Sequence, residues 1–102
     1  MASDDGRTFG VFKGSEEGTP PGDVLAEELE TRGLSQTELA KRMRRPYRLV
    51  NEIVRGKKAI TAGIALDLEG SLGIPASFWM NLESNYRLAR ARLERGAVSS
   101  HP

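Results

Sequence analysis

Prolines and glycines divide residues 21–95 into five short segments, and each segment carries its apolar residues at helical spacing. The clearest helix start is the pair Ser35 and Glu38, because a serine N-cap with a glutamate three residues later forms a capping box. Gly33, Gly56 and Gly73 each follow an apolar stripe, at the position where glycine commonly ends a helix. No segment shows the apolar alternation of a strand. The chain is therefore predicted to be all-α, with five helices.

The ends of the chain differ from this helical region in composition. Residues 1–20 are rich in Gly, Ser and acidic side chains, which predicts a flexible arm. Three apolar residues could pack the arm onto the domain, although we expect it to stay free: Phe9, Val11 and Phe12. The fifth helix is expected to fray near Gly96, so residues 96–102 are predicted to be a disordered tail. The predicted domain spans residues 21–95.

Several function classes are excluded by what the sequence lacks. The chain has no cysteine, so it has neither a disulfide framework nor a thiolate metal site. His101 is the only histidine, and alone it supports neither a metal site nor a catalytic triad. The N-terminus lacks the pattern of a signal peptide, and no apolar run approaches the roughly 18 residues that span a bilayer. We expect a cytoplasmic, non-enzymatic protein with no cofactor, metal, small-molecule ligand or membrane association.

The charge of the chain is unevenly distributed. Residues 1–40 contain nine acidic and three basic side chains, whereas residues 41–58 contain eight basic side chains and one acidic side chain, Glu52. A cationic block in a chain whose net charge is only +1 suggests that one face meets a polyanion. A solvated helix face with scattered arginines is an equally good interpretation of the charge alone.

The second and third predicted helices are joined by about three residues, which is the spacing of a helix-turn-helix. Small Ala40 on the first of these helices permits close approach, and the second helix offers Val50 and Ile53 to pack against it. The outward positions of the second helix are occupied by side chains that can reach bases and phosphates: Tyr47, Arg48, Asn51, Glu52 and Arg55. The motif therefore predicts a DNA-binding surface.

Each outward side chain suggests a particular contact. Arginine such as Arg48 forms bidentate hydrogen bonds to guanine, and asparagine such as Asn51 forms them to adenine. Tyr47 can stack on a sugar or touch a thymine methyl group. Glu52 can accept a hydrogen bond from a cytosine amino group, or it can orient Arg48 four residues earlier.

Other residues are expected to hold the DNA backbone. Gln36 and Thr37 begin a helix, where unpaired N–H groups and the helix dipole favour a phosphate, and Gln36 is then free to bond a phosphate or a base. Lys57 and Lys58 follow Gly56 and add affinity without sequence information. The predicted DNA-binding set is Gln36, Thr37, Arg45, Tyr47, Arg48, Asn51, Glu52, Lys57 and Lys58.

Three runs of sequence resemble a known family in order and spacing. They are Pro21-Gly22-Asp23-Val24-Leu25, then Leu34-Ser35-Gln36-Thr37-Glu38-Leu39-Ala40, then the run from Asn51 to Thr61. With the later run from Leu72 to Tyr86, they are similar to the lambda-repressor-like family and most similar to its HigA-type antitoxins. The resemblance covers about residues 21–90.

This resemblance implies a five-helix fold, a homodimer, a palindromic double-stranded DNA operator and repression of the protein's own operon. It also implies a cognate toxin, usually a ribosome-dependent mRNA interferase, and contact positions at Gln36, Tyr47, Arg48, Asn51 and Glu52. The family often has glycine where this chain has Arg44, and a left-handed arginine there would cost on the order of 1 kcal/mol. Pro46 replaces the usual Ser or Thr cap, and relatives with Arg-Pro here are paired with metallopeptidase-like partners.

The fifth predicted helix carries aromatic and apolar residues that belong to the core or to a dimer interface. We assign four of them to the dimer interface: Phe78, Trp79, Leu82 and Tyr86. The helix-turn-helix predicts DNA binding, and the resemblance implies a homodimeric antitoxin and autorepressor, associated with the nucleoid. Two alternatives stay open, namely a helix-turn-helix regulator without a toxin and an interaction module that neutralises a partner without binding DNA.

Overall fold

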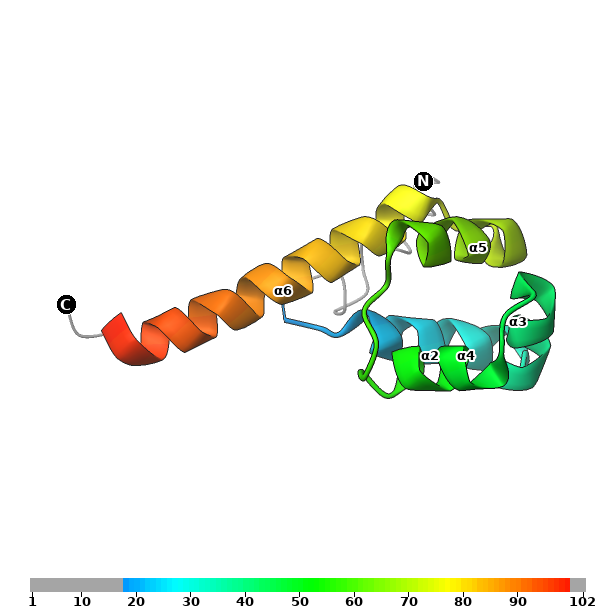
Figure 1. Cartoon of the computed structure of the whole chain (residues 1–102), viewed down its shortest axis with the longest axis horizontal. Coiled ribbons are helices and arrows are strands. Elements are labelled where there is room, and N and C mark those ends of the chain that lie inside the picture. The colour runs from blue at the N-terminus through cyan, green and yellow to red at the C-terminus, as the bar shows by residue number, and fades with distance from the viewer. Residues whose placement is uncertain (1–17, 100–102) are drawn as a thin grey trace, which may run out of the picture.

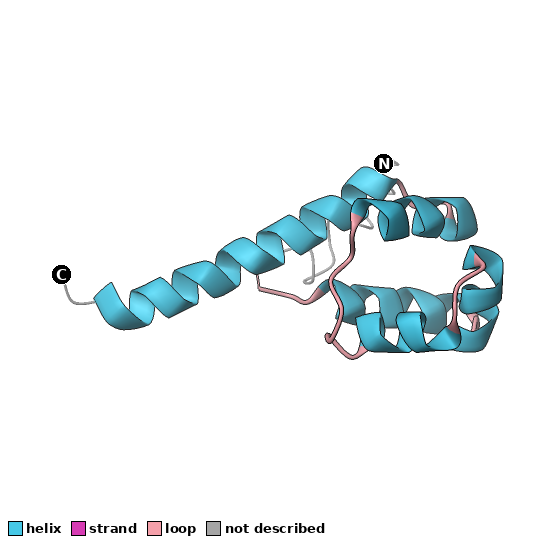
Figure 2. Cartoon of the chain, in the orientation of Figure 1, coloured by secondary structure: helices cyan, strands magenta, loops and turns pink. Residues whose placement is uncertain are grey.

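The computed structural model describes residues 18–99. This part of the chain contains five helices and no strand, as predicted: α2 (Pro21–Arg32), α3 (Gln36–Met43), α4 (Tyr47–Val54), α5 (Ala62–Leu72) and α6 (Ala76–Ser99). Figures 1 and 2 show the four shorter helices gathered into one body, from which α6 extends. The predicted flexible arm and His101 lie outside the described residues, apart from the last three positions of the arm.

The helix starts follow the predicted capping chemistry. The Ser35 hydroxyl accepts from the Glu38 N–H at 3.0 Å, and the Glu38 carboxylate accepts from the Ser35 N–H at 3.0 Å. The bond from the Ser35 N–H, followed by that from its side chain, lowers the pKa of Glu38 below its usual value. Thr61 caps α5 in the same way, since its hydroxyl accepts from the Ile64 N–H at 3.3 Å. The capping box predicted at Ser35 and Glu38 is confirmed.

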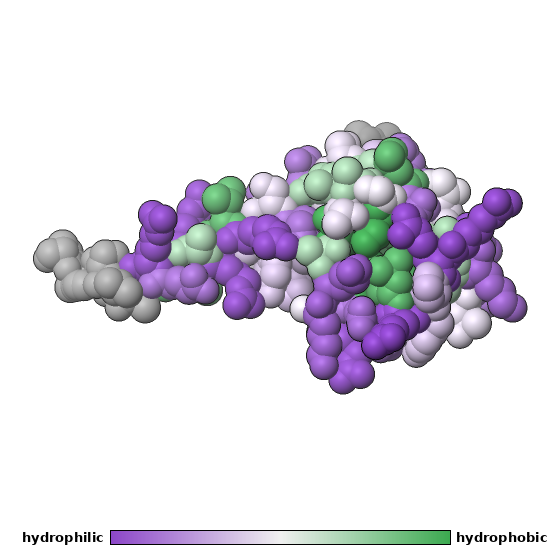
Figure 3. Space-filling model, viewed as in Figure 1, coloured by the Kyte–Doolittle hydropathy of each residue, from purple (hydrophilic) through white to green (hydrophobic). Residues whose placement is uncertain are grey.

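The core lies between the helices of the body and is closed by the first half of α6. Its largest fully buried side chains come from all five helices and from the α5–α6 connection: Trp79, Leu25, Leu39, Ile53, Leu68, Ile74, Val24 and Val50. Figure 3 shows apolar residues concentrated over the body, with hydrophilic residues around them. Fully burying a Val, Leu or Ile side chain stabilises the fold by roughly 1.5–3 kcal/mol.

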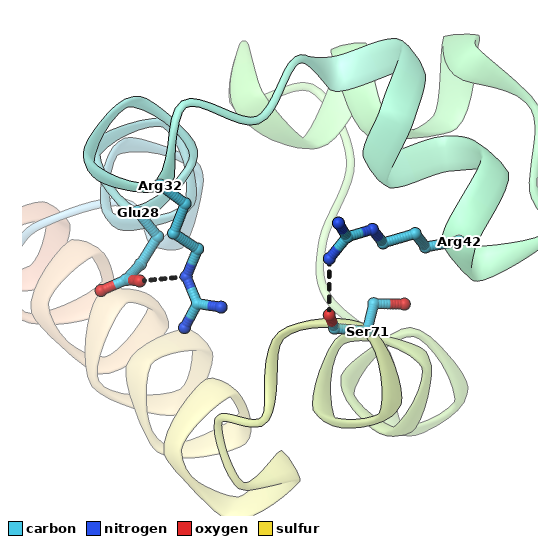
Figure 4. Close-up of polar contacts among 4 residues, drawn as sticks. All are labelled: Glu28, Arg32, Arg42 and Ser71. Carbon is cyan, nitrogen blue, oxygen red and sulfur yellow. Dashed lines mark hydrogen bonds and ion pairs between the residues drawn. The ribbon is translucent and has the colours of Figure 1, made fainter.

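Polar contacts join the elements at the edges of this core. The carboxylate of Glu83, which is 7% exposed, accepts from the Ile60 N–H at 2.9 Å and pairs with Arg87 at 2.9 Å. Figure 4 shows Arg42 of α3 reaching the Ser71 carbonyl at the end of α5, a contact of 3.5 Å, and the Glu28–Arg32 ion pair of 3.0 Å within α2. Of these contacts, the bond from Ile60 to Glu83 joins α6 to the α4–α5 connection, and the bond from Arg42 to Ser71 joins α3 to α5.

Two predictions about α6 are wrong. The helix continues through Gly96 to Ser99, so the predicted disordered tail begins too early. Gly96 costs about 1 kcal/mol relative to alanine in a helix, but strong helix formers flank it and the helix persists. Trp79 and Leu82 are 0% and 4% exposed within a single chain, so neither side chain is available to a second copy.

The remaining members of the predicted dimer interface are only partly buried. Phe78 packs against the core, and its ring meets the Trp79 ring edge-on at 5.4 Å. Tyr86 lies further along α6 and accepts a hydrogen bond of 3.0 Å from Arg90. Leu88 and Leu93 of the same helix are 47% and 72% exposed.

Candidate nucleic-acid interface

The turn between α3 and α4 consists of Arg44, Arg45 and Pro46. Arg44 has φ 59° and ψ 44°, and among the described residues it is the only left-handed one that is not glycine. Two hydrogen bonds close the end of α3, from the Arg44 N–H to the Lys41 carbonyl and from the Arg45 N–H to the Ala40 carbonyl. The strained turn therefore holds an arginine where glycine would fit without cost.

The inner face of α4 fixes the orientation of its outer face. Val50 and Ile53 are at most 1% exposed, whereas Tyr47 is 51% exposed. Gly22 of α2 lies so close to α4 that an added Cβ would stand 2.0 Å from the Ile53 carbonyl oxygen. The sequence prediction named Ala40 as the small residue at a helix contact and missed this second one. The only sequence signal of the contact at Gly22 is a glycine in the first turn of a helix.

The structure brings three of the predicted contact residues together. The side-chain amide of Asn51 donates to Gln36 Oε1 at 3.0 Å and to Tyr47 Oη at 3.3 Å. Gln36 therefore differs from the free side chain predicted for it, because Asn51 of the next helix occupies its carbonyl oxygen. The two helices of the motif are joined by this bond.

A second pair lies on the same helix. Arg48 Nε stands 3.4 Å from Glu52 Oε2, and the Arg48 side chain is 83% exposed. This is the geometry in which Glu52 orients Arg48, one of the two interpretations offered by the sequence. An exposed pair of this kind contributes about 0–1 kcal/mol to stability, so Arg48 can exchange it for a base or phosphate.

Arg45 is held by a residue that the sequence prediction missed. Its guanidinium lies 2.7 Å from the Asp67 carboxylate of α5, in an ion pair that lacks the alignment of a hydrogen bond. No local pattern signals this contact, because 22 positions of sequence separate the two residues and only the packing of α5 brings them together. Asp67 compensates part of the positive charge of the turn.

The other predicted phosphate contacts flank α4. Thr37 is exposed in the first turn of α3, and the N–H groups of Gln36 and Thr37 have no acceptor within residues 18–99. Lys57 and Lys58 are exposed beyond Gly56 and border an open cleft of about 450 Å³ between the α4–α5 connection and α6. Cationic or N–H groups thus stand on both sides of the outward face of α4, as they do where a helix lies in a DNA groove.

A helix-turn-helix family model (HTH_3) matches residues 25–79, which include both helices of the motif and most of the core. The chain belongs to this helix-turn-helix family. Virulence-associated protein I of Dichelobacter nodosus is 38% identical to it over 80 residues, which cover 78% of this chain and 74% of that protein. The family assignment confirms the predicted all-α, lambda-repressor-like fold.

Solved structures extend the likeness beyond the matched residues. An addiction module antidote protein of the HigA family from Coxiella burnetii is 33% identical, with a TM-score of 0.75 over 84% of this chain and 96% of that one. The antitoxin HigA of Pseudomonas aeruginosa, solved with the higBA promoter, is 36% identical, with a TM-score of 0.72 over 79% of this chain and 89% of that one. The predicted resemblance to HigA-type antitoxins is confirmed.

No helix within residues 18–99 combines the length and the apolar character needed to cross a membrane.

Proposed function

We propose that the chain is a DNA-binding antitoxin that represses the operon encoding it and its cognate toxin. One observation carries this proposal: α4 presents Arg48, Asn51 and Tyr47 outward from a helix-turn-helix. Related antitoxins of the same fold include one solved with its promoter. A protein of this kind acts in the cytoplasm, at the nucleoid.

The contacts divide into two groups by their chemistry. Arg48 and Asn51 stand on the helix that enters the major groove, and they read base edges. Thr37, Lys57 and Lys58 lie to either side of that helix and contact phosphates, which adds affinity without sequence preference. Arg45 joins the second group, with Asp67 holding its guanidinium in place.

The repressor is proposed to act as a homodimer on a palindromic operator. Two copies related by a twofold axis place their recognition helices in successive major grooves, about 34 Å apart. Phe78 and Tyr86 are half-buried on α6 and remain the candidate dimer contacts.

The proposal is tested by measuring binding to a duplex of the DNA upstream of the protein's own gene. Arg48→Ala combined with Asn51→Ala removes two base contacts, each worth about 1–3 kcal/mol, so the dissociation constant should rise at least about 30-fold. Arg32→Ala removes the same charge from the far end of α2 and serves as the control, with a change of less than about threefold. Equal affinity of the double variant and the wild type would reject the assignment.

Salt dependence separates DNA binding from a purely protein-binding role. A protein that neutralises several phosphates loses affinity steeply between about 50 and 200 mM salt. Lys57→Ala combined with Lys58→Ala should flatten the plot of log affinity against log salt by about two units of slope. An affinity insensitive to salt would favour the interaction module instead.

A further inference from the structure

We infer that Glu83 of α6 is a positioning residue for the two lysines that are proposed to contact phosphates, an inference that rests on the proposed DNA binding. Its carboxylate holds the α4–α5 connection, residues 55–61, at Ile60, and so sets where Lys57 and Lys58 stand relative to the recognition helix. Glu83 itself touches no DNA in this role. It acts on affinity through the lysines and leaves base preference to α4.

The burial of Glu83 first draws attention to it. Among the described residues it is the only buried one with a charged side chain, and it is 7% exposed. A carboxylate removed from water is tolerated only where hydrogen bonds or ion pairs replace its hydration. Glu83 Oε1 accepts from the Ile60 N–H at 2.9 Å, and Oε2 lies 2.9 Å from Arg87 Nε. One oxygen therefore bonds the α4–α5 connection, and the other bonds a side chain of α6.

The bond to Ile60 closes a segment whose other end is also fixed. The Lys57 N–H donates to the Glu52 carbonyl at 2.7 Å, which ties the start of the connection to the recognition helix. Three residues later Ile60 is bonded to Glu83, and its side chain is buried. Figure 1 shows this connection passing beside α6 on its way to α5. Lys57 and Lys58 thus lie on a short span that is held at both ends.

A firmly held span improves the binding of phosphates by its lysines. Hydrogen bonds to an ionised acceptor are roughly twice as strong as neutral ones, so a carboxylate is an effective anchor for the Ile60 N–H. A loop that must become ordered on binding loses part of its binding free energy to that ordering. Fixing the backbone before DNA arrives avoids this loss. The anchor therefore raises affinity without adding a contact.

The negative charge of Glu83 does not occupy the lysines that it positions. Within residues 18–99 its ion-pair partner is Arg87, whose side chain is 63% exposed, and neither lysine forms an ion pair with it. Lys57 and Lys58 are both exposed. Their ammonium groups therefore stay available for phosphates, as the proposed function requires.

The first experiment compares two substitutions of Glu83 in the full-length chain, on the duplex of upstream DNA. Glu83→Leu removes the acceptor. It should weaken binding about five- to tenfold near 0.1 M salt and flatten the plot of log affinity against log salt by about one unit, as loss of one phosphate contact would. Glu83→Gln keeps an acceptor for the Ile60 N–H, so its affinity should stay within about threefold of the wild type.

A double-mutant cycle separates positioning from a general effect on the fold. In a chain that carries Lys57→Ala and Lys58→Ala, Glu83→Leu should change affinity by less than about twofold, because the groups that it positions are gone. Ile74→Val is the matched control, since it removes a buried carbon from the α5–α6 connection, at the other end of α5. It should lower the melting temperature without changing the salt slope. Circular dichroism confirms that each variant is folded at the temperature of the binding assay.

Nuclear magnetic resonance of the free protein tests the positioning without DNA. In the wild type, the backbone amides of Lys57 and Lys58 should have order parameters close to the value of about 0.85 typical of a rigid backbone. Glu83→Leu should lower both order parameters and speed hydrogen exchange of the Ile60 amide by at least about tenfold. Glu83→Gln should leave both measurements close to those of the wild type.

Three results would overturn the inference and leave the proposed function standing. Unchanged salt slope and order parameters in Glu83→Leu would show that the burial of Ile60 alone holds the connection. An equal loss of affinity with and without the two lysines would assign Glu83 to the fold. An equal loss in Glu83→Gln would assign the effect to the charge rather than to the bond. A wild type that binds the upstream DNA no more tightly than unrelated DNA would instead reject the proposed function, and the inference with it.

Discussion

The body of the molecule and the projecting half of α6 place similar apolar residues in opposite environments. In the body, Trp79 and Leu82 of α6 are buried in the core, and Ala89 is the last buried apolar residue of this helix within the described side chains. Beyond it Leu93 is 72% exposed, although it belongs to the same continuous helix. One helix thus completes a core with its first half and offers an uncovered surface with its second half.

This difference separates residues that hold the fold from residues that are available to a partner. Burial in the body makes its side chains sensitive to substitution, because interiors are packed at crystal density. The outer half of α6 depends on the continuity of the helix and on few tertiary contacts. Substitutions in the two regions should therefore differ mainly in how much they change the free energy of unfolding. They should differ to a smaller extent in how that change depends on protein concentration.

The largest expected effect is the loss of Trp79. Trp79→Ala should lower the free energy of unfolding by about 3–5 kcal/mol, because it leaves a cavity where α6 meets the body. Leu93→Ala should change it by less than about 0.5 kcal/mol at low protein concentration. Urea denaturation followed by circular dichroism measures both values. Equal losses in the two variants would contradict the division of α6.

The contact between α2 and α4 gives an intermediate effect. Gly22→Ala should cost about 1–3 kcal/mol, because its Cβ would meet the Ile53 carbonyl oxygen at 2.0 Å. Gly70 lies in α5 with nothing within 4 Å of an added Cβ, so Gly70→Ala should stabilise the protein by about 0.5–1 kcal/mol. Thermal unfolding of the two variants should shift in opposite directions. Stabilisation by Gly22→Ala as well would show that α2 and α4 separate easily.

The smallest effect concerns the start of α3. The pKa of Glu38 is lowered in the folded chain, so its contribution to stability is present above its unfolded pKa and is lost as pH falls through the folded value. Glu38→Gln should therefore flatten the decline of stability on acidification. Urea unfolding of the variant and the wild type across this pH range measures the difference, and parallel curves would exclude a role for the charge.

Local chemistry explains why much of this fold could be predicted from the sequence. The bounds of α2 follow from Pro21 and Gly33, and the start of α3 follows from Ser35 and Glu38. Sequence reasoning failed where tertiary contact decides the outcome. Trp79 was assigned to an interface because an apolar face does not reveal which neighbour covers it.

The candidate site was likewise predictable from the sequence only in part. The residue types on α4 and their outward spacing were visible in the sequence. The link between Arg48 and Glu52, which stand four residues apart on one helix, was one of the two interpretations that the sequence left open. The bond from Asn51 to Gln36 and the ion pair of Arg45 with Asp67 depend on how the helices cross. The periodicity of apolar residues in the sequence does not reveal the angle at which the helices cross.

The left-handed Arg44 affects both the stability of the turn and the electrostatic potential around it. Glycine at this position would relieve on the order of 1 kcal/mol of strain, but it would also remove a positive charge beside the recognition helix. Fold stability therefore favours glycine at this position, whereas attraction for a polyanion favours arginine. A more stable version of the chain made by Arg44→Gly should reach its DNA more slowly, particularly at low ionic strength.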